Sequence, residues 1–202
     1  NLDLNEGKTV VEIIKGINAG EIKGLYVQGE NPAMSDPDLI HTRKSLAKLD
    51  HLVVQDIFMT ETAWFADVIL PASAHAEKSG TYTNTNRQVQ LGRNVVDPPK
   101  GVKQDWWIIQ EIAKRMGLDW NYASPKEIFD EMKLIMPSLN NISWERLEKE
   151  NYVTYPVKSK NIPGEDIIFY DGFPTSNTLA KIIPVDLINP NDELNSDFPL
   201  IL

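Results

Sequence analysis

The chain contains no cysteine among its 202 residues. This absence excludes disulfides, thiolate zinc sites, cysteine-held iron–sulfur clusters and a cysteine nucleophile within the chain. Its three histidines are scattered along the sequence, a pattern too sparse to indicate a metal site. A chain without cysteine is compatible with a reducing compartment, and we expect a cytoplasmic location.

Positive charge and long apolar runs are also scarce. The formal net charge is −9, so the chain lacks the basic surface that binds nucleic acid or an anionic membrane. No apolar run approaches the ~20 residues of a membrane-spanning helix. Hydrophobic residues make up 42% of the sequence, an ordinary value for a globular protein with a buried core.

Three short apolar runs alternate with helix-prone segments over the first 71 residues. The runs are rich in Val, Ile and Leu and are bounded by Gly or Pro, which is typical of strands buried on both faces. The alternation predicts a Rossmann-like open, mainly parallel α/β sheet flanked by helices, with right-handed crossovers. The expected strands are 23–28, 51–56 and 67–70.

Helix-start signals precede the predicted helices of this region. Thr9 and Glu12 have the spacing of a capping box, and apolar residues follow at helical spacing up to Gly20. Asp36 with Pro37 fits an N-cap followed by proline at the first helical position. Thr60 is the expected N-cap of a short helix before the third strand.

The remaining residues are less regular. Residues 72–104 give few strong signals, and so long a connection in a compact domain is usually functional. We expect helices at about 105–116, 124–136 and 143–150, and hairpins among the Pro- and Gly-punctuated segments beyond Val153. We expect one cofactor-binding α/β domain over 1–202, with a core at about 1–120 and a helical and hairpin extension at about 121–202.

The final run "DFPLIL" is apolar and strand-like. An unpaired apolar strand invites aggregation, so we expect the chain to be excised from a larger subunit. The alternative is that this run pairs with an earlier strand as an ordinary terminal strand.

Polar residues follow the first two predicted strands, where an open α/β sheet binds ligands. Gly29, Glu30 and Asn31 form the first exit, which could approach a phosphate closely or be an ordinary turn. Gln55 and Asp56 form the second. The two oxygens of Asp56 suit an adjacent donor pair, such as the N1–H and amine of guanine, but Asp56 could also cap a helix or face solvent.

Two further charged residues could contact a ligand. Lys78 could neutralise a phosphate or be solvated, and Asp105 precedes the tryptophan-rich helix, where it could be the N-cap. Arg87 is the single firm charge in a stretch dense in amides and hydroxyls. No nucleophile, base and orienting residue occur together, so the sequence favours a cofactor-holding sheet over a reaction centre.

The segment "VVQDIFMTETAWFADVILPASAHAEKSGTYTNTNRQVQ" (53–90) resembles the molybdopterin-guanine-dinucleotide-dependent oxidoreductases. Within this family it is most similar to formate dehydrogenase alpha (catalytic) subunits. The stretches "GLYVQGENPAMSDPD", "KQDWWIIQEIAKRMG" and "DGFPTSNTLAKI" match in the same order. One departure is Asn-Arg-Gln at 86–88, where the family often has Glu-Arg-Arg.

The resemblance implies a parent enzyme that oxidises formate to carbon dioxide and passes electrons through iron–sulfur clusters to an electron-transfer subunit. It implies bis(molybdopterin guanine dinucleotide) with molybdenum or tungsten, and a 4Fe-4S cluster in an N-terminal region that this chain lacks, as it lacks the C-terminal cofactor-capping domain. No residue of the fragment would be catalytic or ligate metal, and alone it would be inactive. Alternatives are a cofactor-free structural domain, as in the large iron–sulfur subunit of complex I, and another family oxidoreductase such as nitrate reductase.

Carried over position by position, the resemblance assigns eight residues to cofactor binding. Asp56 would bind the guanine base, beside Gln55. The nucleotide and its phosphates would lie near Thr60, Lys78 and Asp105. The first exit loop would contribute Gly29, Glu30 and Asn31.

Overall fold

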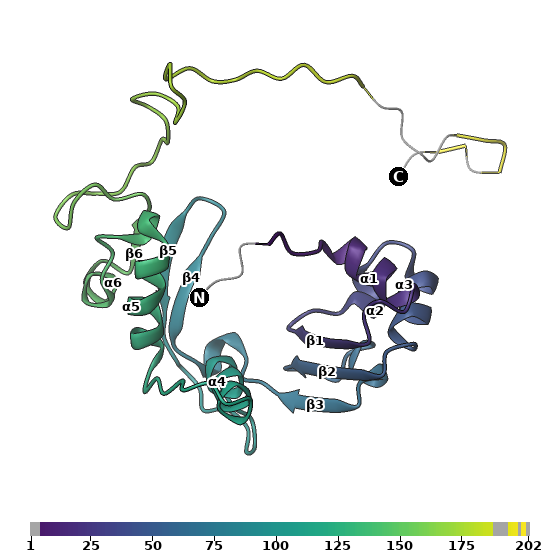
Figure 1. Cartoon of the computed structure of the whole chain (residues 1–202). Coiled ribbons are helices and arrows are strands. Elements are labelled where there is room, and N and C mark those ends of the chain that lie inside the picture. The colour runs from purple at the N-terminus through teal and green to yellow at the C-terminus, as the bar shows by residue number, and fades with distance from the viewer. Residues whose placement is uncertain (1–4, 188–193, 198, 201–202) are drawn as a thin grey trace. The chain divides into compact units, whose positions relative to one another are not determined.

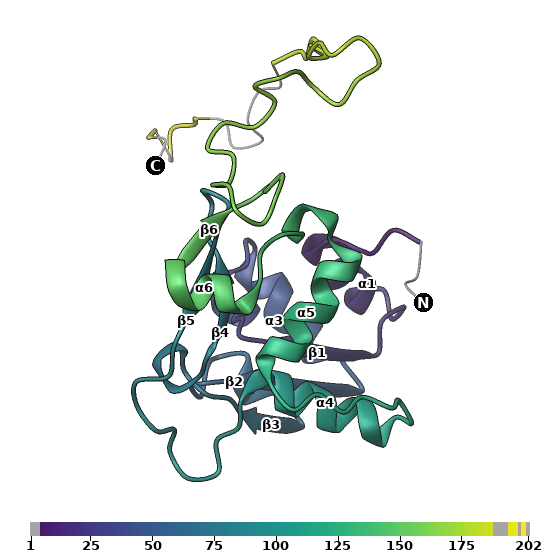
Figure 2. The same cartoon turned by 90° about the vertical axis from the view of Figure 1, so that its left-hand side faces the viewer.

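The structure is a computed structural model that describes residues 5–187, 194–197 and 199–200. The chain divides into two compact units, one ending at Glu165 and one beginning at Asp166. Each unit is described by itself. The first contains all the helices and strands assigned in the described residues (Figures 1 and 2).

A three-stranded parallel sheet forms the first half of this unit, as the sequence predicts (Figure 1). Its order is β1-β2-β3, and the register pairs Val27 with Val54 and Gln55 with Leu70. Side chains of the strands alternate between the two faces of the sheet, and those of Val27, Leu52 and Val54 are buried in a core together with Ala63. The strands are β1 (Gly24–Gln28), β2 (His51–Asp56) and β3 (Val68–Pro71).

Short helices connect these strands. The capping box of Thr9 and Glu12 is present and starts the first helix, which confirms that prediction. Its buried residues Ile14 and Ile17 lie on the face turned towards the rest of the unit. The helices are α1 (Val10–Asn18), α2 (Pro32–Ser35), α3 (Leu39–Leu46) and the 3-10 turn η1 (Ala63–Phe65).

The predicted start of the second long helix at Asp36 is wrong. Asp36 is extended, which is the conformation favoured before a proline, and α3 begins three residues later. Asp38 is its N-cap, with a left-handed φ of 52°, and its carboxylate accepts a hydrogen bond from the His41 N–H at 3.2 Å. Two aspartates bracket Pro37, and the second one has the side-chain geometry of a cap.

An antiparallel sheet forms in the region that gave few sequence signals. The order is β4-β5-β6, and β5 lies in the middle. Val89 and Val153 from this sheet join Phe129 and Leu147 from the helices in a second core. The elements are η2 (His75–Glu77), β4 (Gly80–Thr83), β5 (Gln88–Gly92), α4 (Asp105–Arg115), α5 (Pro125–Ile135), η3 (Pro137–Leu139), α6 (Trp144–Glu150) and β6 (Tyr152–Thr154).

The segment from Tyr155 to Glu165 packs back on this sheet. Arg87, which has a left-handed φ of 63°, donates from its guanidinium to the backbone oxygens of Tyr155 and Glu165. Beyond β6 the described residues form turns, bends and extended stretches, with no hairpin strands among them. Three of the six residues of the "DFPLIL" run (198, 201 and 202) lie outside the described residues, so its prediction as a strand stays a prediction.

Candidate functional site

The carboxyl ends of the three parallel strands lie along one edge of the sheet, where the sequence places its candidate residues (Figure 1). At the end of β1, the Gly29 N–H donates to the Gln55 carbonyl at 2.9 Å. Gly29 has a φ of +61°, and a Cβ there would meet no atom within 4 Å. The backbone of the first exit therefore turns sharply and leaves open space beside it.

A hydrogen-bonded network links the second strand to the residues after the third. The Gln55 amide Nε2 donates to Asp105 Oδ1 at 2.7 Å, and its Oε1 accepts from the Tyr26 hydroxyl. Lys78 donates to Asp105 Oδ2 and, at 3.0 Å, to the Ser73 carbonyl. The structure thus brings together three of the predicted residues, Gln55, Lys78 and Asp105, with Tyr26 and Ser73 beside them.

This network already uses most of the polar capacity of its members. Gln55 is fully buried and both ends of its amide are occupied, so it bridges strands rather than facing a ligand. Lys78 and Asp105 form an ion pair whose side chains are each 24% exposed. Burial, and then the negative charge of Asp105, raise the pKa of the Tyr26 hydroxyl above its usual value. The hydroxyl therefore remains a proton donor.

The suggestion that Asp105 is the N-cap of α4 is wrong. Gln104 occupies the cap position, and Asp105 is the first helical residue. The Asp105 carboxylate instead accepts hydrogen bonds from the Gln55 amide and the Lys78 ammonium. The hydrogen bond from a charged ammonium is stronger than one from a backbone N–H at the helix N-terminus. The negative charge in the first turn still interacts favourably with the helix dipole.

Asn31 joins the first and second exit loops. Its Oδ1 accepts from both the backbone N–H and the hydroxyl of Thr62, at 3.0 and 2.8 Å, and its Nδ2 donates to Glu61 at 2.6 Å. The Thr62 hydroxyl in turn accepts from the Ala33 N–H at 3.0 Å. Thr62 is fully buried, so this junction is part of the folded core of the site rather than a surface contact.

We expect Glu61 to report on this junction by its titration. The hydrogen bond from Asn31 is the main reason why the pKa of Glu61 lies below its ordinary value of 4.5. A carboxyl with a depressed pKa in the folded state stabilises the fold above its unfolded pKa, and that contribution is lost as the pH falls through the folded pKa. Side-chain NMR titration should show the low value in the wild type.

The matched variant for this titration is Asn31→Ala, which removes the donor without touching Glu61. The pKa of Glu61 should then rise towards 4.5. Glu111 is the internal control: its pKa is lowered mainly by the hydrogen bond from Arg115, which the substitution leaves in place, so its titration should be the same in both proteins. An unchanged Glu61 titration in the variant would contradict the hydrogen bond.

Asp56 has free hydrogen-bonding capacity at this edge. It is partly buried, and its Oδ1 accepts from the next residue's N–H, that of Ile57, at 2.6 Å. Among the described residues, its Oδ2 has no hydrogen-bond partner. The predicted N-cap at Thr60 is wrong, since Thr62 occupies the N-cap position of η1, but the Thr60 hydroxyl, and not Asp56, accepts from the Ala63 N–H at 3.2 Å. Asp56 can therefore accept from a ligand without giving up a helix cap.

Glu30 and Ser73 complete the edge in opposite ways. Glu30 is exposed, and among the described residues it accepts only from the Asn31 N–H, at 3.3 Å. The pKa of Asp36 is raised first by the burial of Asp36 and then by the negative charge of Glu30. Ser73 is fully buried, and its hydroxyl oxygen has no hydrogen-bond partner in the part of the chain that the structure describes. No sequence pattern indicated Ser73, Thr62 or Tyr26, because serine, threonine and tyrosine are ordinary in loops and strands.

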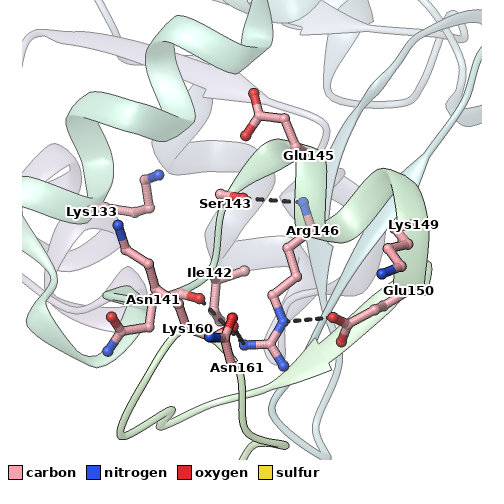
Figure 3. A pocket seen from close by; sticks show the side chains of 10 residues that line it. All are labelled: Lys133, Asn141, Ile142, Ser143, Glu145, Arg146, Lys149, Glu150, Lys160 and Asn161. Carbon is pink, nitrogen blue, oxygen red and sulfur yellow. Dashed lines mark hydrogen bonds and ion pairs between the residues drawn. The ribbon is translucent and has the colours of Figure 1, made fainter.

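A separate polar hollow of about 570 Å³ lies between α5, α6 and the 160–161 loop (Figure 3). The Arg146 guanidinium crosses it and donates to Glu150 at 3.0 Å and to the carbonyls of Lys160 and Ile162 at 3.3 and 2.9 Å. Arg146 thereby holds the 160–162 backbone against α6. None of the predicted site residues lines this hollow, and the Arg146 guanidinium already donates its hydrogen bonds to groups of the chain itself.

Across residues 5–187, 194–197 and 199–200, no group of three or more Asp, Glu or His side chains is placed to hold a metal ion. In the same residues no helix is long and apolar enough to cross a membrane. The edge of the sheet therefore offers hydrogen-bonding groups, one ion pair and open backbone.

The sequence model of the family described as molybdopterin oxidoreductase matches residues 1–115. The F420-dependent formate dehydrogenase subunit alpha of Methanocaldococcus jannaschii is 43% identical over 204 residues, covering 100% of this chain and 30% of the relative. A putative formate dehydrogenase of Staphylococcus aureus is 40% identical over 188 residues, covering 93% and 19%. The chain thus spans less than a third of the length of these curated relatives.

A solved structure shows the same fold. The acetylene hydratase from Pelobacter acetylenicus superimposes with a TM-score of 0.60 at 24% identity, covering 74% of this chain and 21% of that protein. The likeness confirms the mixed α/β architecture.

Proposed function

Because the chain belongs to the molybdopterin oxidoreductase family, we propose that its parallel sheet holds one end of a molybdopterin cofactor at the carboxyl edge of β1, β2 and β3. The observation that carries the proposal is the free oxygen of Asp56 at the exit of a buried strand, beside two loops that Asn31 locks together. When bound, the metal of the cofactor supplies the redox chemistry, and the residues of this chain bind and orient it.

The residues at this edge fit such a group. Gly29 leaves open space where a backbone can approach a phosphate. The buried Ser73 hydroxyl has no partner among the described residues, and a buried polar group without a partner calls for a ligand or a water molecule. Lys78 supplies a positive charge whose position Asp105 fixes. These features suit a polar, anionic ligand better than an apolar one.

Within this proposal the ligand end is a guanine dinucleotide, and Asp56 binds the base. A carboxylate with a free oxygen accepts well from the adjacent N1–H and amine of guanine. Thr60 and the loop of Gly29, Glu30 and Asn31 line the nucleotide. Lys78 lies towards the phosphates, with Gln55 and Asp105 holding it in place.

The parent enzyme of this proposal is a formate dehydrogenase. It would oxidise formate to carbon dioxide, one proton and two electrons, with molybdenum or tungsten as the metal. The electrons would pass through a 4Fe-4S cluster outside this chain to an electron-transfer subunit. The support is the 40–43% identity to proteins with this name, which applies to less than a third of their length. The proposed location is the cytoplasm.

A specific observation supports one other function, that of a structural domain without a cofactor. Gln55, Lys78 and Asp105 satisfy one another, as polar groups must when no ligand is present. Asp56 distinguishes the two functions because its free oxygen has no structural use among the described residues. The test of the proposal therefore targets Asp56.

In the full-length protein, we expect Asp56→Ala to weaken retention of the guanine nucleotide about tenfold or more while the fold is kept. Hydrogen bonds to a charged acceptor contribute about 1.5–3 kcal/mol each, and 1.4 kcal/mol is tenfold in affinity. The measurement is the guanine nucleotide released per mole of purified, denatured protein, after washing for increasing times. Circular dichroism of the same sample reports the fold.

Asp97→Ala, at an exposed residue in the 93–100 connection, is the matched control and should retain wild-type nucleotide content. Equal retention by the Asp56 variant and this control would support the structural domain instead. Loss of folded signal in the Asp56 variant alone would assign Asp56 to the architecture of the β2 exit.

A further inference from the structure

The polar hollow between α5, α6 and the 160–161 loop carries an excess of positive charge (Figure 3). Four cationic side chains line it against two carboxylates, although the chain as a whole has a net charge of −9. The cations are Lys133, Arg146, Lys149 and Lys160, and the carboxylates are Glu145 and Glu150. A local reversal of charge of this kind attracts anions to one place on an acidic protein.

Both carboxylates of the hollow are already neutralised by ion pairs. Glu145 pairs with Lys126 at 2.9 Å, and Glu150 pairs with Arg146 at 3.0 Å. Lys126 also pairs with Asp130 at 3.0 Å, so the acidic groups around the hollow each have a cation of their own. The positive charge that is left over therefore belongs to the lysines that line the hollow.

Lys160 carries a charge that no other group of the described chain neutralises. Across residues 5–187, 194–197 and 199–200, its ammonium makes no ion pair and no hydrogen bond. Its backbone is nevertheless fixed, because its carbonyl and that of Ile162 accept from the Arg146 guanidinium at 3.3 and 2.9 Å. The Arg146 side chain is only 10% exposed, so a buried anchor holds the loop that presents Lys160.

A second lysine lies beside Lys160. Figure 3 shows Lys133 on the same side of Arg146 as Lys160, whereas Lys149 lies on the other side. Lys133 donates to Asp130 at 2.6 Å, which uses one of the three N–H groups of its ammonium and a carboxylate that it shares with another lysine. Two ammonium groups from separate elements, α5 and the loop after β6, therefore border one space with a single negative charge to balance them.

We propose that this side of the hollow binds a dianionic phosphoryl group between Lys133 and Lys160. A phosphoryl group has three terminal oxygens, which accept from both ammonium groups and leave one for the Asn161 amide that also lines the hollow. The planar guanidinium that suits a carboxylate is already engaged with Glu150 and with backbone carbonyls. The lysines that remain are point charges, which favour a dianion. The site is separate from the carboxyl edge of the parallel sheet and does not depend on the ligand proposed there.

The test is residue-resolved acetylation of lysines in the full-length protein, read by mass spectrometry. With inorganic phosphate added and the ionic strength held constant with sodium chloride, the acetylation rate of Lys160 should fall in a saturable way, because a bound dianion keeps the ammonium protonated and shields it. Exposed Lys44 is the internal control and should react at one rate throughout. An unchanged rate at Lys160 up to about 50 mM phosphate, which saturates even a millimolar site, would overturn the proposal.

Two variants locate the site within the hollow. Lys133→Gln removes one charged donor, so the phosphate concentration that halves the acetylation rate of Lys160 should rise about tenfold or more. Lys149→Gln removes the same charge from the other side of Arg146 and should change that concentration less than about threefold. An equal effect of the two substitutions would show a diffuse field of charge instead of a site and would overturn the proposal.

Two further probes identify the chemistry of the ligand. If glycerol 2-phosphate protects Lys160 at a lower concentration than inorganic phosphate does, the phosphoryl group belongs to a larger molecule that fills the hollow, and the opposite order assigns the site to free phosphate. Both orders support a phosphoryl site. Acetate is a monoanion and should protect about tenfold less well. Acetate that protects Lys160 as well as phosphate does would overturn the phosphoryl assignment.

Discussion

Replacing Gly164 by alanine is expected to lower the free energy of unfolding by about 3 kcal/mol or more. An added Cβ would lie 1.4 Å from the Thr154 carbonyl oxygen and 2.5 Å from its carbon. Both atoms belong to the backbone of β6, so no side-chain rotation relieves the overlap. The segment that contains Gly164 must then separate from β6 and break the hydrogen bond of the Glu165 N–H to the Pro156 carbonyl.

Urea unfolding of the full-length protein, or of this chain if it folds alone, measures the effect. The matched control is Gly80→Ala in β4, where an added Cβ meets no atom within 4 Å and the strand should be unaffected or slightly stabilised. Equal unfolding midpoints for the Gly164 and Gly80 variants would show that the 155–165 segment does not pack as the structure has it.

Asp105→Ala should lower the free energy of unfolding by about 2–4 kcal/mol. The substitution removes the acceptor of two donors at once, the Gln55 amide and the Lys78 ammonium. Gln55 is fully buried, so its amide loses a partner that water does not readily replace. Lys78 is partly exposed, which moderates the cost of its lost partner.

Glu111→Ala is the matched control for this variant. Glu111 also pairs with two cations, Lys114 and Arg115, but both are more exposed than Lys78 and neither is a buried donor like Gln55, so its loss should cost less than about 1 kcal/mol. A second variant, Asp105→Ala with Gln55→Leu, replaces the buried donor as well and should recover part of the lost stability. Asp105→Ala with the stability of the control would mean that the network contributes nothing to the fold.

The parallel sheet was predictable from the sequence because its strands are nearly continuous apolar runs bounded by Gly and Pro. The antiparallel sheet was not. Strands β4 and β5 are mostly Thr, Gln and Gly, and among them only Val89 is fully buried. Strands β4 and β5 pair with each other across the 84–87 turn, but their third partner, β6, is distant in the sequence, so no local pattern reveals the whole sheet.

The site could be predicted as a place but not as a set of contacts. The second strand exit indicated Gln55 and Asp56, and the start of the tryptophan-rich helix indicated Asp105; Gln55 and Asp105 are bound to each other. Register decides this outcome: Gln55 points to the face of the sheet where Tyr26 and α4 supply its partners, and Asp56 is left at the exit. The spacing of residues in the sequence determines which of them reach the carboxyl edge of the sheet. Packing alone determines which of these keep a free hydrogen-bonding group for a ligand.

The junction of Asn31 with Thr62 has a consequence for how the edge responds to anything that binds there. Because one side chain ties together two loops that are 31 positions apart, neither loop can change conformation alone. The conformational entropy of the two loops is therefore lost when the chain folds. A ligand that binds to the ordered loops does not lose this entropy again, which favours its binding. Conversely, local opening of either loop should release the other, so the two should exchange hydrogen as one cooperative unit.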